Sequence, residues 1–296
     1  MSIKKISFCA ALATLLGLVG CADQHEANAM PETTTQASSA PTASKLPATA
    51  PTYLVATEAS YAPYEFRGAN GEIIGFDVDL LTAIGEKQGF KVQFLSRPWD
   101  GIFDTLKDGE RDIVGAATEI TEERKQTMDV SDPYLETRQL VVVKDSAADI
   151  KVFEDLKTKT VATQAGTTVD ILKALQGSED KVVVTNTQYL AFKELLAGRV
   201  DAAFGEEGVM QYYVSSLSPE ISKEKLRVIP YVRAEKAYLG FYVKKGRTDL
   251  LNQINAGVKE VQADGTYQKI HDKWFGKQQL DKALGETAKA EAASAP

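Results

Sequence analysis

The sequence has very few of the side chains that bind transition metals. Among its 296 residues are two histidines, His25 and His271, and two cysteines, Cys9 and Cys21. A structural zinc site usually takes four Cys or His ligands held close together, whereas these four residues are scattered along the chain. The sequence therefore argues against a zinc site, and we expect neither a metal nor a cofactor.

The sequence also lacks an excess of positive charge. It has 34 Lys and Arg residues against 41 Asp and Glu residues, which gives a formal net charge of -7 at pH 7. Proteins that bind nucleic acids usually carry a basic stripe that pairs with phosphates, and no such stripe is present. Nucleic acid is therefore not an expected partner.

One apolar run, residues 6–19, follows Lys4 and Lys5 near the start of the chain. It is too short for a stable spanning helix and is typical of a secretory signal peptide. The run ends in Leu18-Val19-Gly20-Cys21, which resembles the lipobox of bacterial lipoproteins; an ordinary signal with an incidental cysteine is the alternative. We predict a lipoprotein signal peptide over residues 1–20 and lipidation of Cys21, which would anchor the protein to a membrane in the periplasm or at the cell surface.

Two polar segments flank the part of the chain that is expected to fold. Residues 21–52 carry the lipidated cysteine and are rich in Thr, Ser, Ala and Pro, a composition that cannot bury enough apolar surface to fold. We predict a disordered tether there. Residues 280–296 predict a polar tail, either a frayed helix or disordered. About 225 residues lie between these segments, enough for one large domain or two smaller ones.

Two short patterns occur twice within that region. Val55-Ala56-Thr57-Glu58 is matched by Val161-Ala162-Thr163-Gln164. Leu106-x-x-Gly109-x-x-Asp112 is matched, in the same order, by Leu195-x-x-Gly198-x-x-Asp201. Each unit of the second pattern indicates a helix closed by a glycine and followed by a short buried strand. The repetition favours two lobes of similar construction, with coincidence among common α/β patterns as the alternative.

The neighbouring segments alternate between helix and strand. An apolar helical face over residues 76–84 is closed by Gly89, residues 91–95 alternate like a strand, and residues 140–143 form a continuous apolar strand. In open α/β sheets, ligands bind beyond the carboxyl ends of the strands. The polar and aromatic residues that follow expected strand ends are found at 58–61, 99, 117–124, 166–168 and 206.

Longer motifs resemble those of a known family. From about residue 53 to residue 276 the chain resembles the periplasmic amino-acid-binding proteins of ABC transporters, solute-binding protein family 3. The motifs that carry the resemblance are, in order, TEASYAPYEF (57–66), GFDVDL (75–80), ITEER (120–124), SDPY (131–134), AGTT (165–168) and ADGTY (263–267).

The resemblance implies an α/β fold class with two lobes joined by two crossing hinge strands. Lobe 1 is expected in two pieces, residues 53–142 and 240–279, and lobe 2 at residues 143–239. The crossings are expected near Val142–Lys144 and Tyr238–Phe241. The resemblance also implies a monomeric receptor that binds an amino acid between its lobes and delivers it to an ABC transporter permease.

The resemblance assigns the ligand carboxylate to Arg124 and to the segment that contains Thr167 and Thr168. Thr121 fits an N-cap, which places Arg124 in the first turn of a helix, where an arginine is often a simple surface charge. The matching family arginine holds a carboxylate through two parallel hydrogen bonds. Gly166, Thr167 and Thr168 precede a helical run, so their backbone N–H groups suit the same carboxylate. A capped turn without a ligand is the alternative.

Four other residues match ligand contacts of the family. Glu206 stands where an aspartate usually pairs with the ligand ammonium, and it is one methylene longer. Tyr61 and Trp99 match flat side chains that pack on the ligand, and Glu58 matches an acidic contact of the receptors for basic amino acids. Each residue also has an alternative role without a ligand. Glu206 would be a surface glutamate at a strand end, Tyr61 and Trp99 would be core aromatic residues, and Glu58 would cap the following turn.

Glu119 is the main departure from the family pattern, because Ser or Thr normally donates to the ligand carboxylate there. A carboxylate about 4 Å away would repel the ligand by roughly 4 kcal/mol at an effective dielectric near 20. Glu119 must therefore point away, pair with a cation such as Arg97 or Arg138, or meet a positive group of the ligand. Ala117, where glycine is common, is a milder change, and Thr118 completes the candidate site.

These features predict a non-enzymatic receptor for a polar L-amino acid. Arginine or lysine is expected ahead of glutamine or cystine, because Glu58 and Glu119 are acidic and a guanidinium can stack between aromatic rings. Two alternatives stay open. One is a periplasmic enzyme similar to the cyclohexadienyl dehydratases, to which Glu119, Glu206 and Glu207 would supply acidic groups. The other is a surface antigen or adhesin lipoprotein on the same fold.

Overall fold

The computed structural model describes residues 46–216 and 225–276, all within one compact unit of the chain, Ser44–Pro296. The predicted signal peptide, Cys21, the tether up to residue 45 and the tail at 280–296 lie outside the described residues. Within residues 46–216 and 225–276, no helix is both long enough and apolar enough to cross a bilayer.

The first lobe is built on a five-stranded sheet in the order β5-β1-β6-β15-β7. Strand β1 pairs in parallel with β5 and β6, and β15 returns from late in the chain to pair antiparallel with β6 and β7. The strands are β1 Thr52–Thr57, β5 Lys91–Ser96, β6 Ile113–Val114, β7 Met128–Val130 and β15 Tyr242–Lys244.

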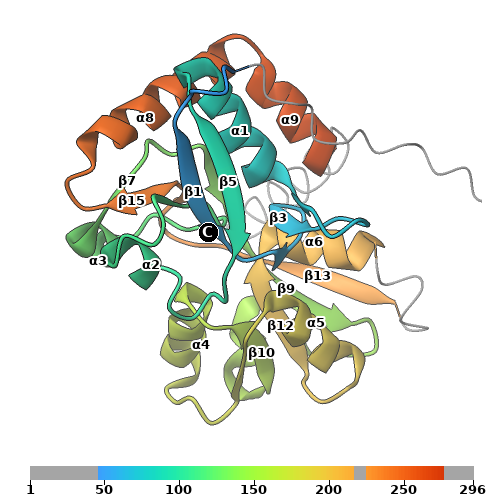
Figure 1. Ribbon diagram of the computed structural model, residues 1–296. Helices are drawn as coiled ribbons and strands as arrows, with labels where there is room; N and C mark the ends of the chain where they lie inside the picture. Colours follow the sequence, from blue (N-terminus) through green and yellow to red (C-terminus); the bar gives the residue numbers. More distant parts are fainter. Residues whose placement is uncertain (1–45, 217–224, 277–296) are drawn as a thin grey trace, which may run out of the picture. The chain divides into compact units, whose positions relative to one another are not determined.

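Helices α1, α8 and α9 gather beside this sheet (Figure 1). Helix α1 buries Phe76, Leu80, Leu81 and Ile84, which is the apolar face predicted from the sequence, and ends at Gly89 with a left-handed φ of 79°. The bounds in this lobe are α1 Phe76–Gln88, α8 Thr248–Ala263, α9 Thr266–Phe275, the short helices α2 Asp104–Lys107 and α3 Glu122–Thr127, and a small sheet of β2 Ser60–Tyr61, β3 Glu65–Arg67 and β4 Ile73–Ile74.

The second lobe has a sheet in the order β11-β10-β12-β9-β13, with α4 and α5 packed against β10 (Figure 1). Strand β10 pairs in parallel with β11 and β12, and β9 pairs antiparallel with β12 and β13. The elements are β9 Gln139–Lys144, a 3-10 helix Phe153–Thr158, β10 Val161–Gln164, α4 Thr167–Gln176, β11 Val182–Thr185, α5 Gln188–Leu196, β12 Ala202–Glu206, α6 Glu207–Ser216 and β13 Leu226–Tyr231.

A two-stranded antiparallel ribbon joins the sheets. It pairs β8, Leu135–Thr137, with β14, Ala237–Leu239. The predicted second crossing near Tyr238–Phe241 overlaps β14, but the predicted first crossing near Val142–Lys144 lies inside β9 of the second sheet, so the chain leaves the first lobe earlier than residue 142. Val141, Val142 and Val143 are fully buried, as an apolar run covered on both faces of a sheet must be. This run is therefore a strand of the second sheet and not the crossing. The two-lobed α/β fold class predicted from the sequence is confirmed.

The internal repeat is a repeat of structure. Val55 and Ala56 of β1 face Ile113 and Val114 of β6 in parallel, and residues 161–162 of β10 face residues 202–203 of β12 in the same way. The glycine of each second pattern has a left-handed backbone, with φ of 74° at Gly109 and 70° at Gly198, where a side chain would be strained.

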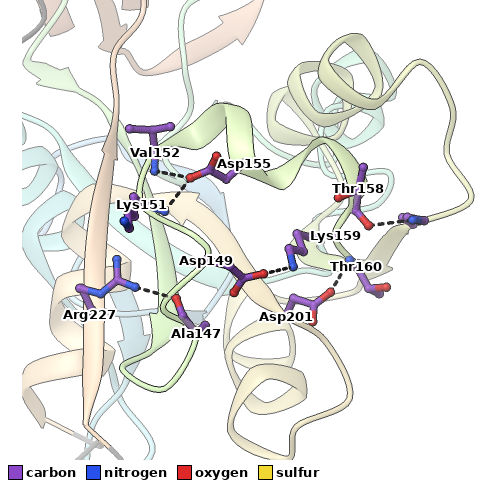
Figure 2. Close-up of polar contacts among 11 residues, drawn as sticks. Ala147, Asp149, Lys151, Val152, Asp155, Thr158, Lys159, Thr160, Asp201 and Arg227 are labelled. Carbon is purple, nitrogen blue, oxygen red and sulfur yellow. Dashed lines mark hydrogen bonds and ion pairs between the residues drawn. The ribbon is translucent and has the colours of Figure 1, made fainter.

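The aspartates that end the two patterns make equivalent contacts. Asp112 Oδ2 accepts a hydrogen bond from the backbone N–H of Leu54 at 2.9 Å, and Asp201 Oδ2 accepts one from Thr160 N–H at 2.8 Å. Figure 2 shows the second of these. Each aspartate therefore ties the start of its own strand to the neighbouring strand of the same sheet, which explains why the pattern recurs.

The segment that leads to β10 is held by further polar contacts, also drawn in Figure 2. Asp155 Oδ2 accepts from the N–H groups of Lys151 at 2.7 Å and Val152 at 3.1 Å, while the Lys159 ammonium donates to Asp149. None of these residues lines the cavity that holds the candidate site described below, so this network supports the second lobe and is separate from that site.

Candidate ligand-binding site

A cavity lies between the carboxyl end of β1 and the N-terminal end of α4, beside the β8/β14 ribbon. It contains about 570 Å³ of empty space, part of which is open to solvent. Nine of the ten ligand-binding residues predicted from the sequence border it, so the structure brings together residues that lie up to 148 positions apart (Glu58 to Glu206). The lining residues are Glu58, Tyr61, Trp99, Ala116, Ala117, Glu119, Arg124, Thr137, Gln139, Gln164, Ala165, Gly166, Thr167, Thr168, Gln188, Glu206 and Leu239.

Thr118 is the predicted residue that does not border this cavity. Its side chain is fully buried, and its hydroxyl donates to the carbonyl of Ala116 at 3.2 Å. Beside it, Ala117 has a left-handed φ of 42°, which explains why glycine suits this position. The backbone N–H of Ala117 donates to Asp77 Oδ2 at 2.8 Å, which stabilises this unusual conformation.

Arg124 is held at one end of the cavity. Helix α3 begins at Glu122, and Thr121 is its N-cap as predicted, with the hydroxyl oxygen accepting from Arg124 N–H at 3.3 Å. The guanidinium carbon of Arg124 lies 5.5 Å from the ring centroid of Trp99 and 5.2 Å from that of Phe103. One Nη1 hydrogen bond of 2.6 Å reaches the backbone carbonyl of Glu119. These contacts hold the plane of the guanidinium in a defined orientation.

The N-terminal end of α4 approaches the same end of the cavity from the second lobe. Gly166 precedes the helix with φ of 137°, a conformation that favours glycine. The hydroxyl of Thr168 donates to the carbonyl of Gln164 at 3.2 Å, and the hydroxyl of Thr167 donates to Glu119 Oε2 at 3.1 Å. Both hydroxyls therefore have protein partners, and the first N–H groups of α4 suit an anion.

Glu119 has a partner that sequence reasoning missed. Its Oε1 accepts a hydrogen bond from Arg233 Nη1 at 2.7 Å in an ion pair. The predicted partners are wrong, because Arg97 pairs with Glu110 at 2.6 Å and Arg138 reaches Glu136 at 3.6 Å. No local pattern pointed to Arg233, which lies 114 residues from Glu119 in the sequence.

Glu58 lines the cavity and bridges the two lobes. It is 5% exposed, and it accepts hydrogen bonds from Ser60 Oγ at 2.9 Å and from Gln164 Nε2 at 2.6 Å. Burial raises the pKa of Glu58 to about 7, although these two hydrogen bonds act in the other direction. The turn contact that was the alternative role of Glu58 is present, through Ser60. The bond to Gln164 adds a contact with the second lobe.

Glu206 borders the cavity but already has several protein donors. Its Oε1 accepts from Tyr64 Oη and Thr137 Oγ1, both at 2.9 Å, and its Oε2 accepts from Val209 N–H at 2.9 Å. Burial raises its pKa to about 7. The carboxylate therefore caps the start of α6, a role that sequence reasoning missed.

Gln139 and Gln164 are further lining residues that sequence reasoning missed. Gln139 is 3% exposed, and its Oε1 accepts no hydrogen bond from the residues that the structure describes. A polar residue at the start of an apolar strand was the available signal for Gln139. For Gln164 the signal was the internal repeat, which aligns it with Glu58. A buried acceptor without a partner at Gln139 suits an N–H donor of a ligand.

The aromatic residues predicted to pack on a ligand both border the cavity. The ring of Trp99 makes an edge contact with Phe103 at 5.5 Å between centroids, and the ring of Tyr61 lies 6.1 Å from that of Tyr64. Both predicted side chains are half-buried, so each keeps part of its surface accessible.

Buried carboxyl groups continue behind the cavity. Glu65 is fully buried, and neither of its oxygens has a hydrogen-bond partner among the described residues. Burial, together with the charges of Asp77, Glu58 and Glu206, raises the pKa of Glu65 well above its usual range. Burial also raises the pKa of Asp77 to about 7. Across residues 46–216 and 225–276, no group of His, Cys, Asp and Glu side chains is arranged to hold a metal ion.

Comparisons with known proteins agree on one family. The model of the bacterial extracellular solute-binding proteins, family 3, matches residues 53–277. The chain is 34% identical over 229 residues to a probable histidine-binding protein of Neisseria gonorrhoeae, with 76% of this chain and 84% of that protein covered.

Solved structures of similar proteins point to the same group. An ancestral arginine-binding protein, solved with arginine, is 40% identical with a TM-score of 0.69, over 76% of this chain and 98% of the other. The same ancestral protein has been solved with glutamine. An arginine-, lysine-, histidine-binding protein from Geobacillus stearothermophilus is 35% identical with a TM-score of 0.71, over 76% and 96% of the two chains.

Proposed function

The chain belongs to the bacterial extracellular solute-binding proteins of family 3, and we propose that it holds an L-amino acid between its lobes and delivers it to the permease of an ABC transporter. The observation that carries the proposal is the meeting of Arg124 and the N-terminal end of α4 at one end of a single cavity. A guanidinium fork and the first N–H groups of a helix both favour a carboxylate. Both halves of the site come from one chain, which supports a monomeric receptor.

Other residues that line the cavity favour a cationic or amide-bearing ligand side chain. Glu58 offers a buried carboxylate, and Gln139 offers a carbonyl oxygen that has no hydrogen-bond partner within residues 46–216 and 225–276. Tyr61 and Trp99 supply flat surfaces on which a guanidinium or imidazole can stack. Similar proteins named for arginine, lysine and histidine, one of which was solved with glutamine, fit this chemistry, and arginine is the ligand that uses every one of these groups.

Calorimetry with arginine, lysine, histidine, glutamine, glutamate and cystine tests the proposal. Arginine or lysine should bind most tightly. If a neutral or acidic member binds at least about tenfold tighter, a difference of about 1.4 kcal/mol, the cationic preference is wrong while the receptor function stands. If none of the amino acids binds, the receptor function itself is wrong. Mass spectrometry of small molecules that co-purify with the protein gives an independent answer.

We also propose that the protein catalyses no reaction on its ligand. Arg124 and the start of α4 already form a complete carboxylate site, and the similar proteins reported above are named for binding alone. Incubation of the pure protein with prephenate tests the dehydratase alternative. Formation of phenylpyruvate above a no-protein control would overturn the non-enzymatic proposal.

The proposed location is the extracytoplasmic side of a membrane, held by a lipid on Cys21. The support comes from the signal-like residues 1–20 and from the family, whose members are extracellular solute-binding proteins. Cys21→Ser should move the protein from the membrane fraction to the soluble fraction, with Cys9→Ser as the matched control. An unchanged distribution of the Cys21→Ser variant would exclude lipid anchoring at this residue.

A further inference from the structure

Glu119 lines the cavity and contacts three parts of the molecule. Its backbone carbonyl accepts from Arg124 Nη1 at 2.6 Å, within the first lobe. Its Oε2 accepts from Thr167 Oγ1 at 3.1 Å, in the second lobe. Its Oε1 accepts from Arg233 Nη1 at 2.7 Å, in the segment between β13 and β14. The negative charge of Glu119 is therefore bonded to the first turn of α4, and the backbone of the same residue is bonded to Arg124, the two groups that suit the carboxylate of an amino acid.

Arg233 lies behind Glu119 and outside the cavity lining. It follows β13 in the segment 232–236 that leads back to β14, and it borders a separate surface hollow together with Glu136 and Lys236. Its side chain is 28% exposed and that of Glu119 is 11% exposed, so the ion pair is largely shielded from water. Two opposite charges attract each other more strongly when they are shielded from water. Removing one of them leaves the other unpaired, at a larger cost in free energy than at an open surface.

We propose, on the basis of the proposed amino-acid receptor function, that Arg233 is a positioning residue that makes the cavity accept a carboxylate. Arg233 cancels the charge of Glu119 and holds its carboxylate against Thr167, away from the guanidinium face of Arg124 that the ligand needs. Without Arg233, the unpaired Glu119 repels the carboxylate of a free amino acid. The same unpaired charge has no such effect on the corresponding decarboxylated amine, so Arg233 selects amino acids over amines.

The test compares arginine with agmatine, which is arginine without its carboxylate, in calorimetric titrations of the full chain. Arg233→Gln should weaken arginine binding by at least about tenfold while agmatine binds as well as before or better. The double variant Arg233→Gln with Glu119→Gln removes both charges and should restore arginine binding to within about threefold of the wild type. Histidine and histamine serve as a second pair if the wild type prefers histidine.

Lys236→Gln is the matched control. Lys236 is a cation of the same segment, and its ammonium donates to Glu136 at 2.8 Å on an exposed surface, so its loss should alter neither titration. Thermal unfolding of each variant identifies any that fail to fold; for these, Arg233→Lys, which keeps the charge, should preserve the preference for arginine over agmatine.

Two results would overturn the role of Arg233. One is an equal loss of arginine and agmatine binding in Arg233→Gln, which indicates a purely structural role. The other is a double variant that binds arginine no better than Arg233→Gln. The wild-type titrations judge the proposed function separately, because a wild type that binds no amino acid excludes the receptor function before any variant is compared.

Discussion

The two lobes repeat one strand pattern but end it with different chemistry. Strand β1 leads into Glu58, and the matching strand β10 ends in Gln164. The two side chains meet between the lobes, where Gln164 Nε2 donates to Glu58 Oε2 at 2.6 Å. Two similar sheets thus place a charged acceptor and a neutral donor at equivalent positions and join them as partners.

This contrast extends over the whole cavity. The first lobe supplies the ionisable groups Glu58, Glu119 and Arg124, whereas the second supplies mainly dipoles from the start of α4 and the amide of Gln164. The carboxylate of Glu206, in the second lobe, is engaged in capping α6. We infer that the first lobe selects the charge of the ligand and the second selects its hydrogen-bonding pattern.

The largest effect on ligand binding is expected for Arg124→Lys, in the first lobe. Lysine keeps the charge but loses the fork and the flat face that lies 5.5 Å from Trp99. We expect calorimetry to show a loss of about 2 kcal/mol or more in amino-acid binding. Lys125→Ala is the control, because the ammonium of Lys125 pairs with Glu122 on the surface, at 2.8 Å, and Lys125 does not line the cavity. Wild-type affinity in Arg124→Lys would show that the carboxylate is held elsewhere.

Exchanging the two strand ends tests whether the charge must come from the first lobe. Glu58→Gln should weaken arginine binding by about 1.5 kcal/mol, since a charged acceptor is lost, and should affect glutamine less. The double variant Glu58→Gln with Gln164→Glu moves the carboxylate to the second lobe. If titration shows that this variant binds arginine like the wild type, the division of labour between the lobes is wrong.

The pH dependence of binding follows from the raised pKa of Glu58, about 7 because of burial. A bound cation favours the ionised carboxylate, so binding lowers this pKa and releases a proton. Arginine affinity should therefore rise between about pH 5 and pH 8, by at most about tenfold per pH unit for each proton released. Titration near pH 6.5 in two buffers of different ionisation enthalpy measures the proton release.

Glu58→Gln should flatten this profile without abolishing it, because burial raises the pKa of Glu206 to about 7 as well. A profile that is already flat in the wild type would mean that neither carboxyl group changes its protonation on binding. An unchanged slope in Glu58→Gln would assign the pH dependence to the second lobe.

The smallest expected effect is a difference in the free energy of unfolding between variants of the two equivalent aspartates, Asp112 and Asp201. Asp112 binds the partly buried N–H of Leu54, while Asp201 binds the more exposed N–H of Thr160. Asp112→Ala should lower the free energy of unfolding by about 1–2 kcal/mol and Asp201→Ala by less than about 1 kcal/mol, because water can replace the exposed partner. Urea unfolding measures both, and equal losses would show that the two lobes use the repeat in the same way.

Short stretches of sequence predicted the local structure well. The cap at Thr121 and the left-handed glycines at 89, 109 and 198 depend on neighbouring residues alone. The same holds for the strand ends that carry the lining residues, because a parallel α/β sheet exposes those ends along one edge. The first crossing was misplaced, since an apolar run predicts a buried strand without indicating to which sheet the strand belongs.

The sequence by itself determined the two-lobed fold, the internal repeat and most of the residues around the cavity, because these follow from local patterns and motifs. Only the tertiary structure decided that Arg233 neutralises Glu119, 114 residues away, and that Tyr64 donates to Glu206, 142 residues away. It also decided that Glu65 is buried with no hydrogen-bond partner among the residues that the structure describes. The physical reason is that ion pairing and desolvation depend on which side chains the crossing chain packs together, and no short stretch of sequence contains that information.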